Sequence, residues 1–452
     1  MEGFNTSAAI PMSTFSTTTT SSCSSGTNIT TNTTTTLNPT SPWMDSRIWS
    51  KLPQRLIDRV LAFLPPPAFF RARSVCKRWY SLLFSDSFLE MYLHISPRCY
   101  WFLFFKHKSL KSYIYKSGNS GGGDDRDNCE GYLFDPNECT WYRLPFELVP
   151  SGFSPASSSG GLICWVSDNA GAKSLILCNP LLKTVTQLPP TLRPRLFPSI
   201  GLTVGASSID VVVAGDDLIS QFAVKNLTTE SFHVDGGGFF SIWGTTCPLP
   251  RLCSLESGRM VFVNGRLYCM NYSPFSVLAY DIAANEWSKI QAPMRRFLRS
   301  PSLVECRGRL VLVAAVEKSK LNVPRSMRLW GLQGCGTTWV EVERMPQQLY
   351  AQFSEAEAGK GFDCVGHGDF ITITIQGTDM VLLYDFYRKA WQWIPPCPFI
   401  RRSVGGEGGS RSTGSDGGGG GGLHGFAYEP RIVTPAIGLI DQSSLPFQSF
   451  NG

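Results

Sequence analysis

Apolar residues recur every three or four positions in the segment that begins after residue 46, a spacing typical of one face of an α-helix. Pro53 fits the first turn of this predicted helix, and the prolines at 65–67 end it. A second apolar set, from Phe69 to Leu83, predicts two further short helices. A helical segment of about fifty residues is small for a core of its own, so part of its apolar surface is expected to contact another chain.

After residue 95 the helical spacing gives way to short apolar runs and a repeated unit. Three times an aromatic–Asp pair precedes a Trp by seven residues, and weaker copies begin at Cys178, Val224 and Trp330. The six anchors, at residues 134, 178, 224, 280, 330 and 384, are therefore 44 to 56 residues apart. This period is close to the ~50 residues of a kelch-type propeller blade. The complete copies are Phe134-Asp135 with Trp141, Tyr280-Asp281 with Trp287, and Tyr384-Asp385 with Trp391.

A β-rich apolar run precedes each anchor, and one of these runs is divided by Asn264-Gly265, which predicts a tight hairpin. A repeated Trp is expected to pack between neighbouring blades. The repeated Asp is expected to accept backbone N–H groups in a turn rather than to act in catalysis. The predicted fold is a small all-α unit followed by an all-β propeller of about six blades, with five or seven as alternatives.

Near its carboxyl end the chain has a Gly-rich stretch, followed by a strand-like run from Phe426 to Thr434. Such a late strand can close the ring by pairing with an earlier blade, which removes an exposed sheet edge. The expected organisation is a disordered Ser/Thr-rich tail at 1–44, a helical domain at 45–93 and a propeller at 96–440. Within the propeller, 403–423 is a flexible Gly-rich loop and 424–440 is the closing strand.

Composition excludes several classes of protein. Hydrophobic residues make up 42% of the chain and charged residues 17%, which is typical of a globular protein. No apolar run approaches the ~20 residues needed to cross a bilayer, so no membrane partner is expected. The 14 Cys lack metal-site spacing and are interpreted as reduced thiols of a nucleocytoplasmic protein. The five His also lack such spacing, so neither a cofactor, a metal nor a catalytic residue is predicted.

The helical segment resembles the F-box, the module that docks on the Skp adaptor of cullin-based ubiquitin ligases. The resemblance rests on Leu52-Pro53, Leu64-Pro65 and the run from Arg73 to Trp79, in that order. It implies an Skp-family adaptor and a cullin complex as partners, and a substrate receptor without catalytic activity of its own. The expected adaptor contacts are Leu52, Pro53, Leu56, Ile57, Val60, Leu61, Leu64, Phe70 and Trp79.

The whole ordered chain is similar to plant floral-identity F-box proteins of the Unusual Floral Organs/Fimbriata family. The residues that carry this similarity are 44–53, 98–105 and 318–324. The similarity implies a substrate-recognition subunit of a cullin-based ligase that also acts as co-regulator of the LEAFY transcription factor in floral meristem and organ identity. It further implies a nuclear location, with the cytoplasm as a second one.

Basic side chains cluster on two loops of neighbouring predicted blades, although the net charge of the whole chain is only +6. Because a LEAFY-type partner would hold promoter DNA beside the propeller, these loops are expected to contact phosphates within a ternary complex. A solvated loop is the alternative. The candidate residues are Arg295, Arg296, Arg299, Lys318, Lys320, Arg325 and Arg328.

Two functions of different class remain open at this point. In one, the chain is purely a ligase receptor that selects proteins for degradation and makes no DNA contact. In the other, it is chiefly a transcriptional co-regulator, with the F-box as an accessory. Both functions use the same surfaces, so the sequence does not separate them.

Overall fold

The computed structural model describes residues 51–106, 130–220, 223–235, 242–251, 253–255, 258–272, 275–318, 323–400 and 422–434, without the side chains of 217–226 and 318–325. The predicted tail at 1–44 and most of the Gly-rich loop, 403–421, lie outside these residues. The described chain forms two compact units, and the boundary between them along the sequence lies between Cys99 and Tyr100.

The first unit is helical, as the apolar spacing predicts. Leu64 lies just beyond its first helix, and two of the prolines at 65–67 begin the next helix instead of only ending the first. The rings of Phe69 and Phe88 stack in its centre, 5.7 Å apart. Its elements are α2 (Gln54–Phe63), α3 (Pro66–Arg73), α4 (Lys77–Tyr80), the 3₁₀ helix η1 (Ser81–Phe84) and α5 (Asp86–Ile95). Its buried core consists of Leu61, Ala62, Phe69, Leu82, Phe88 and Tyr92.

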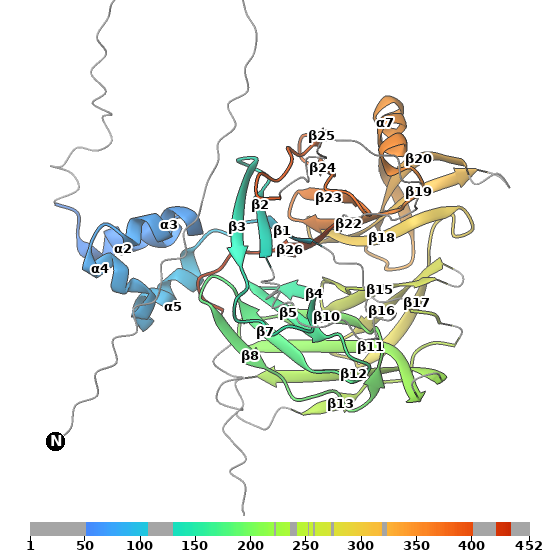
Figure 1. Ribbon diagram of the computed structural model, residues 1–452, viewed down its shortest axis with the longest axis horizontal. Helices are drawn as coiled ribbons and strands as arrows, with labels where there is room; N and C mark the ends of the chain where they lie inside the picture. Colours follow the sequence, from blue (N-terminus) through green and yellow to red (C-terminus); the bar gives the residue numbers. More distant parts are fainter. Residues whose placement is uncertain are drawn as a thin grey trace, which may run out of the picture. The chain divides into compact units, whose positions relative to one another are not determined.

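The second unit consists of antiparallel sheets, and its described residues form six four-stranded sheets, one for each blade (Figure 1). This confirms the predicted six-bladed propeller. Blade 1 consists of β26 (Leu423–Tyr428), β1 (Trp101–Lys106), β2 (Glu130–Asp135) and β3 (Thr140–Pro145). Blade 2 consists of β4 (Phe153–Ser159), β5 (Leu162–Ser167), β7 (Leu175–Asn179) and β8 (Thr184–Gln187). Blade 3 consists of β10 (Ser199–Val204), β11 (Ser208–Ser220), β12 (Ala223–Asp235) and β13 (Trp243–Thr245).

The remaining three blades follow the same order along the chain. Blade 4 consists of β14 (Val261–Val263), β15 (Arg266–Tyr272), β16 (Phe275–Asp281) and β17 (Glu286–Gln291). Blade 5 consists of β18 (Leu298–Cys306), β19 (Arg309–Lys318), β20 (Val323–Leu332) and β21 (Trp339–Arg344). Blade 6 consists of β22 (Phe362–His367), β23 (Phe370–Ile375), β24 (Val381–Asp385) and β25 (Ala390–Trp393). A helix, α7 (Gln347–Glu357), is inserted between blades 5 and 6 and lies beside β20 (Figure 1).

The first strands of the blades form the inner ring of the propeller. Each contacts the next in the order β26, β4, β10, β14, β18 and β22, and β22 contacts β26 in turn. The late strand β26 pairs with β1 over six residues, so blade 1 combines the two ends of the propeller chain. The strand is shorter than the sequence suggests, because it ends at Tyr428 rather than continuing to Thr434. Pro430 lacks the N–H group that a longer ladder would need.

The repeated aromatic and Trp residues face each other across the outer hairpin of a blade. Phe134 pairs with Trp141, and Tyr280 and Tyr384 pair with their own Trp in the same way. The repeated Asp closes the turn between them, as predicted. Its carboxylate accepts an N–H from Asn137 in blade 1 at 2.9 Å, and equivalent bonds form in blades 4 and 6.

Two of the weaker repeat copies need correction. In blade 3 the facing pair is Phe232 and Trp243, whereas Val224 pairs with Leu218 in the preceding hairpin. A longer connection separates Phe232 from its Trp, which hides the seven-residue spacing. In blade 5 the residue opposite Trp339 is Leu332 rather than Trp330, so the spacing there is regular but the anchor is not aromatic.

In blades 1, 3, 4 and 5 the repeated Trp joins the blade to the one before it, as the predicted packing between blades requires. The indole N–H of Trp141 donates to Pro395 O of blade 6 at 2.9 Å, and that of Trp243 donates to Pro189 O at 2.7 Å. Trp287 and Trp339 make the corresponding bonds to the ends of blades 3 and 4. The Trp side chains therefore fix the angle between neighbouring blades as well as filling space.

The Asn264-Gly265 turn and the buried thiols also match the sequence predictions. Asn264 and Gly265 have φ values of 49° and 80°, which the tight hairpin between β14 and β15 requires. The described cysteines are free, and Cys164, Cys178, Cys269 and Cys306 are buried in strands.

Candidate protein-binding surfaces

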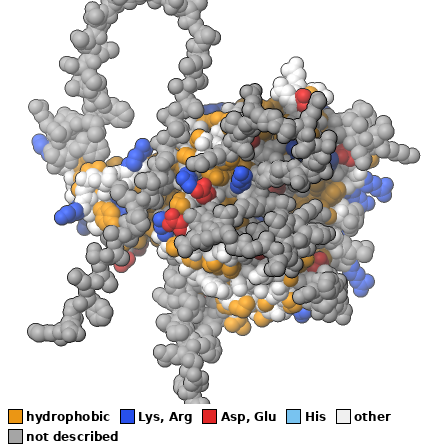
Figure 2. Space-filling view, in the orientation of Figure 1, with side chains coloured by type: hydrophobic (Ala, Val, Ile, Leu, Met, Phe, Trp, Pro, Cys, Tyr) orange, Lys and Arg blue, Asp and Glu red, His pale blue; other side chains and the backbone are white. Residues whose placement is uncertain are grey.

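Helix α2 has an exposed apolar stripe on one side and core residues on the other. Leu56, Val60 and Phe63 are 46%, 43% and 54% exposed, at a spacing of four and then three residues. Leu61 is only 3% exposed because it lies about 140° around the helix from Leu56. Figure 2 shows apolar side chains at the surface of the helical unit beside basic ones. The stripe is the part of α2 that is available to a partner.

The predicted adaptor-contact residues fall into three groups by exposure. Pro53 is exposed with Leu56 and Val60, whereas Leu61 is buried in the core and is not available for contact. The expectation that Leu61 touches the adaptor directly is therefore corrected. The residues of intermediate exposure are Leu52, Ile57, Leu64, Phe70 and Trp79.

Four exposed apolar residues of the helical unit were missed by the sequence reasoning. They include Phe63, which completes the α2 stripe and could have been found from its position on the helix. The other three lie in or next to α4 and η1, where the elements are too short for periodicity to separate exposed from buried positions. They are Val75, Tyr80 and Phe84, which are 67%, 46% and 64% exposed.

Hydrogen bonds and a cation–π contact from charged side chains connect the elements that carry the exposed apolar residues. Both Asp58 carboxylate oxygens accept hydrogen bonds from Arg78 at 2.7 Å, which ties α2 to α4. Arg73 donates to Tyr80 O at 3.1 Å and lies 4.6 Å from the Tyr80 ring centre. The desolvation that accompanies this packing lowers the pKa of Arg73. The helical unit thus presents a preorganised apolar surface rather than a loose one.

On the propeller, a tight turn exposes two of the candidate DNA-contact residues. Arg295 and Arg296 are exposed between Met294, which has a φ of 49°, and Phe297, whose N–H donates to Met294 O at 2.8 Å. Among the residues that the structure describes, neither Arg forms an ion pair. Both guanidinium groups are therefore available for an external anion.

Two other DNA-contact candidates, Arg299 and Arg328, are already paired with carboxylates within the propeller. Arg299 donates to both carboxylate oxygens of Glu357 at 2.5 and 2.6 Å. Burial alone would raise the pKa of Glu357, but the hydrogen bonds from Arg299 and a backbone N–H lower it. Arg328 contacts Glu341 at 3.1 Å. Lys320 and the side chains of Lys318 and Arg325 lie outside the described residues.

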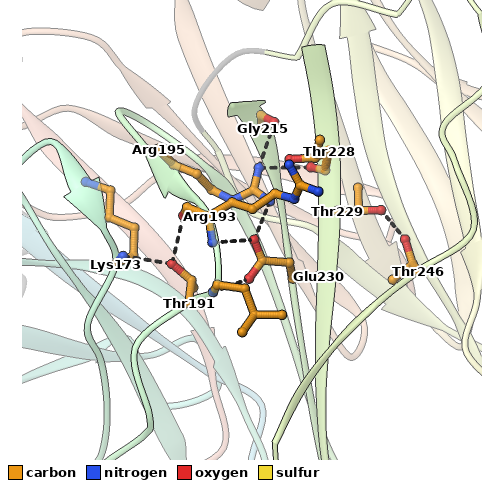
Figure 3. A network of polar contacts seen from close by, with 10 residues as sticks. Lys173, Thr191, Arg193, Arg195, Gly215, Thr228, Thr229, Glu230 and Thr246 are labelled. Atoms are coloured by element: carbon orange, nitrogen blue, oxygen red, sulfur yellow. Dashed lines mark hydrogen bonds and ion pairs between the residues drawn. The ribbon is translucent and has the colours of Figure 1, made fainter. Parts of the chain in front are cut away.

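A buried charge pair fixes a loop between blades 2 and 3 (Figure 3). Arg195 and Glu230 are both fully buried and 2.9 Å apart, and Arg195 also donates to Gly215 O at 2.7 Å. Glu230 accepts the backbone N–H groups of Leu192 and Arg193. This network anchors the loop, including the short strand β9 (Pro194–Arg195), which pairs with β6 (Gly171–Ala172). Leu192 is held in a position that leaves it 59% exposed.

Arg195→Met is expected to lower the free energy of unfolding of the propeller by about 3–5 kcal/mol, because it leaves the Glu230 charge buried without a partner. Arg195→Met with Glu230→Met should recover most of that loss. Arg307→Met is the control, since Arg307 forms an exposed pair with Asp369 and should cost about 0–1 kcal/mol. Equal losses for Arg195→Met and Arg307→Met in denaturant unfolding would contradict the structural role of the buried pair.

Neither a metal site nor a membrane-spanning helix is found in the described part of the chain. No group of three or more His, Cys, Asp or Glu there could hold a metal ion. No helix among the described residues is long and apolar enough to cross a membrane.

Comparison with protein families agrees with the two units. Residues 49–91 match the family model described as F-box domain, and residues 133–354 match the one described as KIB1-4 beta-propeller. The propeller is therefore supported by both the fold and a family model, and the number of six blades comes from the fold. The kelch type of the repeat stays a prediction, because the matching propeller model is a different one.

Several curated proteins resemble the chain over most of its length. Protein UNUSUAL FLORAL ORGANS from Arabidopsis thaliana is 64% identical over 90% of each chain. Protein ABERRANT PANICLE ORGANIZATION 1 from Oryza sativa subsp. indica is 44% identical over 89% of this chain and 92% of that protein. SKP1-interacting partner 15 from Arabidopsis thaliana is 23% identical over 78% of this chain and 95% of that protein. The chain therefore belongs to the family of F-box propeller proteins that includes Protein UNUSUAL FLORAL ORGANS.

Proposed function

We propose that the chain is the substrate-recognition subunit of a cullin-based (SCF) ubiquitin ligase, without catalytic activity of its own. The observation that carries this proposal is the exposed stripe of Leu56, Val60 and Phe63 on an F-box helix. Exposure of three such side chains to water is unfavourable, and their burial under a partner stabilises the complex. The partner is an Skp-family adaptor, which links the chain to the cullin. A relative is itself named as an SKP1-interacting partner, which supports this choice.

The proposed role extends to gene regulation in flowers. The identity of 64% with Protein UNUSUAL FLORAL ORGANS supports a function in floral meristem and organ identity. In this proposal the propeller binds a LEAFY-type transcription factor in the nucleus and acts as its co-regulator. The loop that carries Leu192, held by the buried pair of Arg195 and Glu230, is a surface on which the propeller can hold such a partner.

The proposal includes a helper contact with promoter DNA through Arg295 and Arg296. Each neutralised phosphate contributes about 0.9 to the slope of log affinity against log salt concentration. Arg295→Ala with Arg296→Ala should therefore reduce the slope of the ternary complex by about two units, while binding to the transcription factor without DNA persists. Electrophoretic shifts at several salt concentrations measure this, with Arg307→Ala as the control for a surface arginine that is already paired. An unchanged slope would mean that the turn is simply solvated.

The alternative is a receptor that selects proteins for degradation and makes no DNA contact. Deletion of residues 45–93 separates the two ideas in a promoter-activation assay with the transcription factor present. If activation survives, the co-regulator role does not depend on the ligase. If activation is lost while the propeller still binds the transcription factor, adaptor recruitment is required. A propeller that never binds the transcription factor would reject the co-regulator role.

A further inference from the structure

Arg259 occupies an unusual position in the propeller, because it is held by the backbone of a neighbouring blade. It lies just before the innermost strand of blade 4 and forms a parallel bridge with Ile200 of blade 3. Ile200 N donates to Gly258 O at 3.0 Å, and Met260 N donates to Ile200 O at 2.9 Å. These bonds fix the backbone of Arg259 and therefore the point from which its side chain extends.

The guanidinium group of Arg259 contacts two other blades. It donates to the carboxylate of Asp363 at 2.5 Å and to Cys364 O at 3.0 Å, both in blade 6. It also donates to Gly425 O in the closing strand β26 and lies 5.5 Å from the ring centre of Phe426. The three hydrogen-bond acceptors are 104 to 166 residues away in the sequence.

The order of the blades shows where this side chain must run. In a ring of six blades, blade 1 lies opposite blade 4. Gly425 belongs to the innermost strand of blade 1, and Arg259 lies just before the innermost strand of blade 4. A side chain that begins at blade 4 and reaches Gly425 therefore crosses the central channel. The Arg259 side chain is only 15% exposed, so it is largely enclosed where it crosses.

The acceptor of Arg259 is itself held by its neighbours. The other carboxylate oxygen of Asp363 accepts from Cys364 N at 2.9 Å and lies 3.4 Å from the Ser302 hydroxyl of blade 5. His424 Nδ1, at the start of β26, lies 3.7 Å from the same carboxylate. The cluster around Arg259 therefore connects blades 4, 5, 6 and 1 at one level of the channel.

The closing strand differs from the other inner strands because it comes from the other end of the propeller chain than the strand it pairs with, so hydrogen bonds and packing alone attach it to its blade. In blade 1, β26 pairs with β1 along one edge and its other edge faces the channel. A carbonyl group on that free edge needs a donor where water is displaced. Arg259 supplies this donor to Gly425 O and covers the Phe426 ring.

We infer that Arg259 is a latch that locks β26 into the ring and closes the channel at this level. The latch is formed only after the last strand arrives, because its acceptors belong to blade 6 and β26. A second consequence is that partner proteins bind the propeller on its loops and outer surfaces rather than through the channel. This inference is independent of the proposed ligase function.

Hydrogen–deuterium exchange on the full chain tests the latch. In Arg259→Met, the amides of 423–428 should exchange at least about tenfold faster, whereas those of β11 and β12 change less than about twofold. Arg307→Met is the matched control, because it removes an exposed arginine that pairs with Asp369 in the same part of the propeller. It should leave exchange of 423–428 within about twofold of the parent chain.

Arg259→Lys decides the matter if Arg259→Met is insoluble. Lysine keeps the charge but lacks the planar fork that reaches both Asp363 and Gly425, so exchange of 423–428 should again increase selectively. Unchanged exchange of 423–428 in a soluble variant overturns the latch. An increase of the same size in all six blades also overturns it, because Arg259 would then contribute only to general stability.

Discussion

Leu56→Ala combined with Val60→Ala will abolish co-purification of the chain with an Skp-family adaptor. Both side chains are exposed on α2, so their loss should leave the helical unit folded while it removes the centre of an apolar contact. Two such truncations at an interface together cost roughly 3 kcal/mol or more, which is about a hundredfold or more in Kd. Pull-down with the purified adaptor, followed by titration calorimetry, measures the loss. Leu52→Ala with Pro53→Ala is expected to act in the same direction.

Two further variants separate contact from folding. Arg55→Ala removes an exposed polar side chain of the same helix and should leave binding unchanged. Leu61→Ala creates a cavity in the core and should lower the free energy of unfolding by about 2–5 kcal/mol. If Leu56→Ala with Val60→Ala binds as well as the parent chain, the exposed stripe is not the adaptor surface.

A chain that stops at Gly422 will aggregate rather than form a stable propeller. The truncation removes β26, whose Leu423, Phe426 and Tyr428 are buried. Burial of each such side chain contributes about 1.5–3 kcal/mol, so the total loss is comparable to the net stability of a whole domain. It also leaves β1 as an unpaired edge next to the channel. Light scattering and thermal unfolding of the truncated chain measure the effect.

Shortening the Gly-rich loop is the control for this truncation. Removal of six residues within 405–421 should be nearly neutral, because loop length changes the entropy of closure only slowly. Gly422 is kept in this control variant. A Cβ atom at Gly422 would lie 2.5 Å from Gly377 N. A soluble and fully stable chain ending at Gly422 would contradict closure by β26.

Local patterns in the sequence were sufficient to predict most of the propeller. The seven-residue spacing between an aromatic residue and Trp reflects a hairpin of constant length, so it identified the blades wherever that length is kept. It failed at Phe232 and Trp243, where the hairpin connection is longer. It was misassigned in blade 5, because Leu332 takes the place of an aromatic residue.

The functional surfaces were less accessible from sequence, because they depend on which side of an element faces the core. Periodicity grouped Leu61 with Leu56, although the two point in directions about 140° apart. The charge cluster likewise grouped Arg299 with Arg296, although Arg299 is paired with Glu357 from a helix 58 residues away. The Arg259 contacts join residues more than a hundred positions apart, so no local sequence pattern predicts them.

Whether the chain links an Skp-family adaptor to a LEAFY-type transcription factor is tested directly by a bridging experiment with purified proteins. An immobilised Skp-family adaptor is incubated with a LEAFY-type transcription factor, with or without the full chain, and the captured proteins are quantified. We expect the transcription factor to be retained only when the chain is present, and Leu56→Ala with Val60→Ala to eliminate its retention. Retention of the chain without the transcription factor, at concentrations where the chain and the transcription factor bind each other in solution, would show that the chain does not bridge the two proteins.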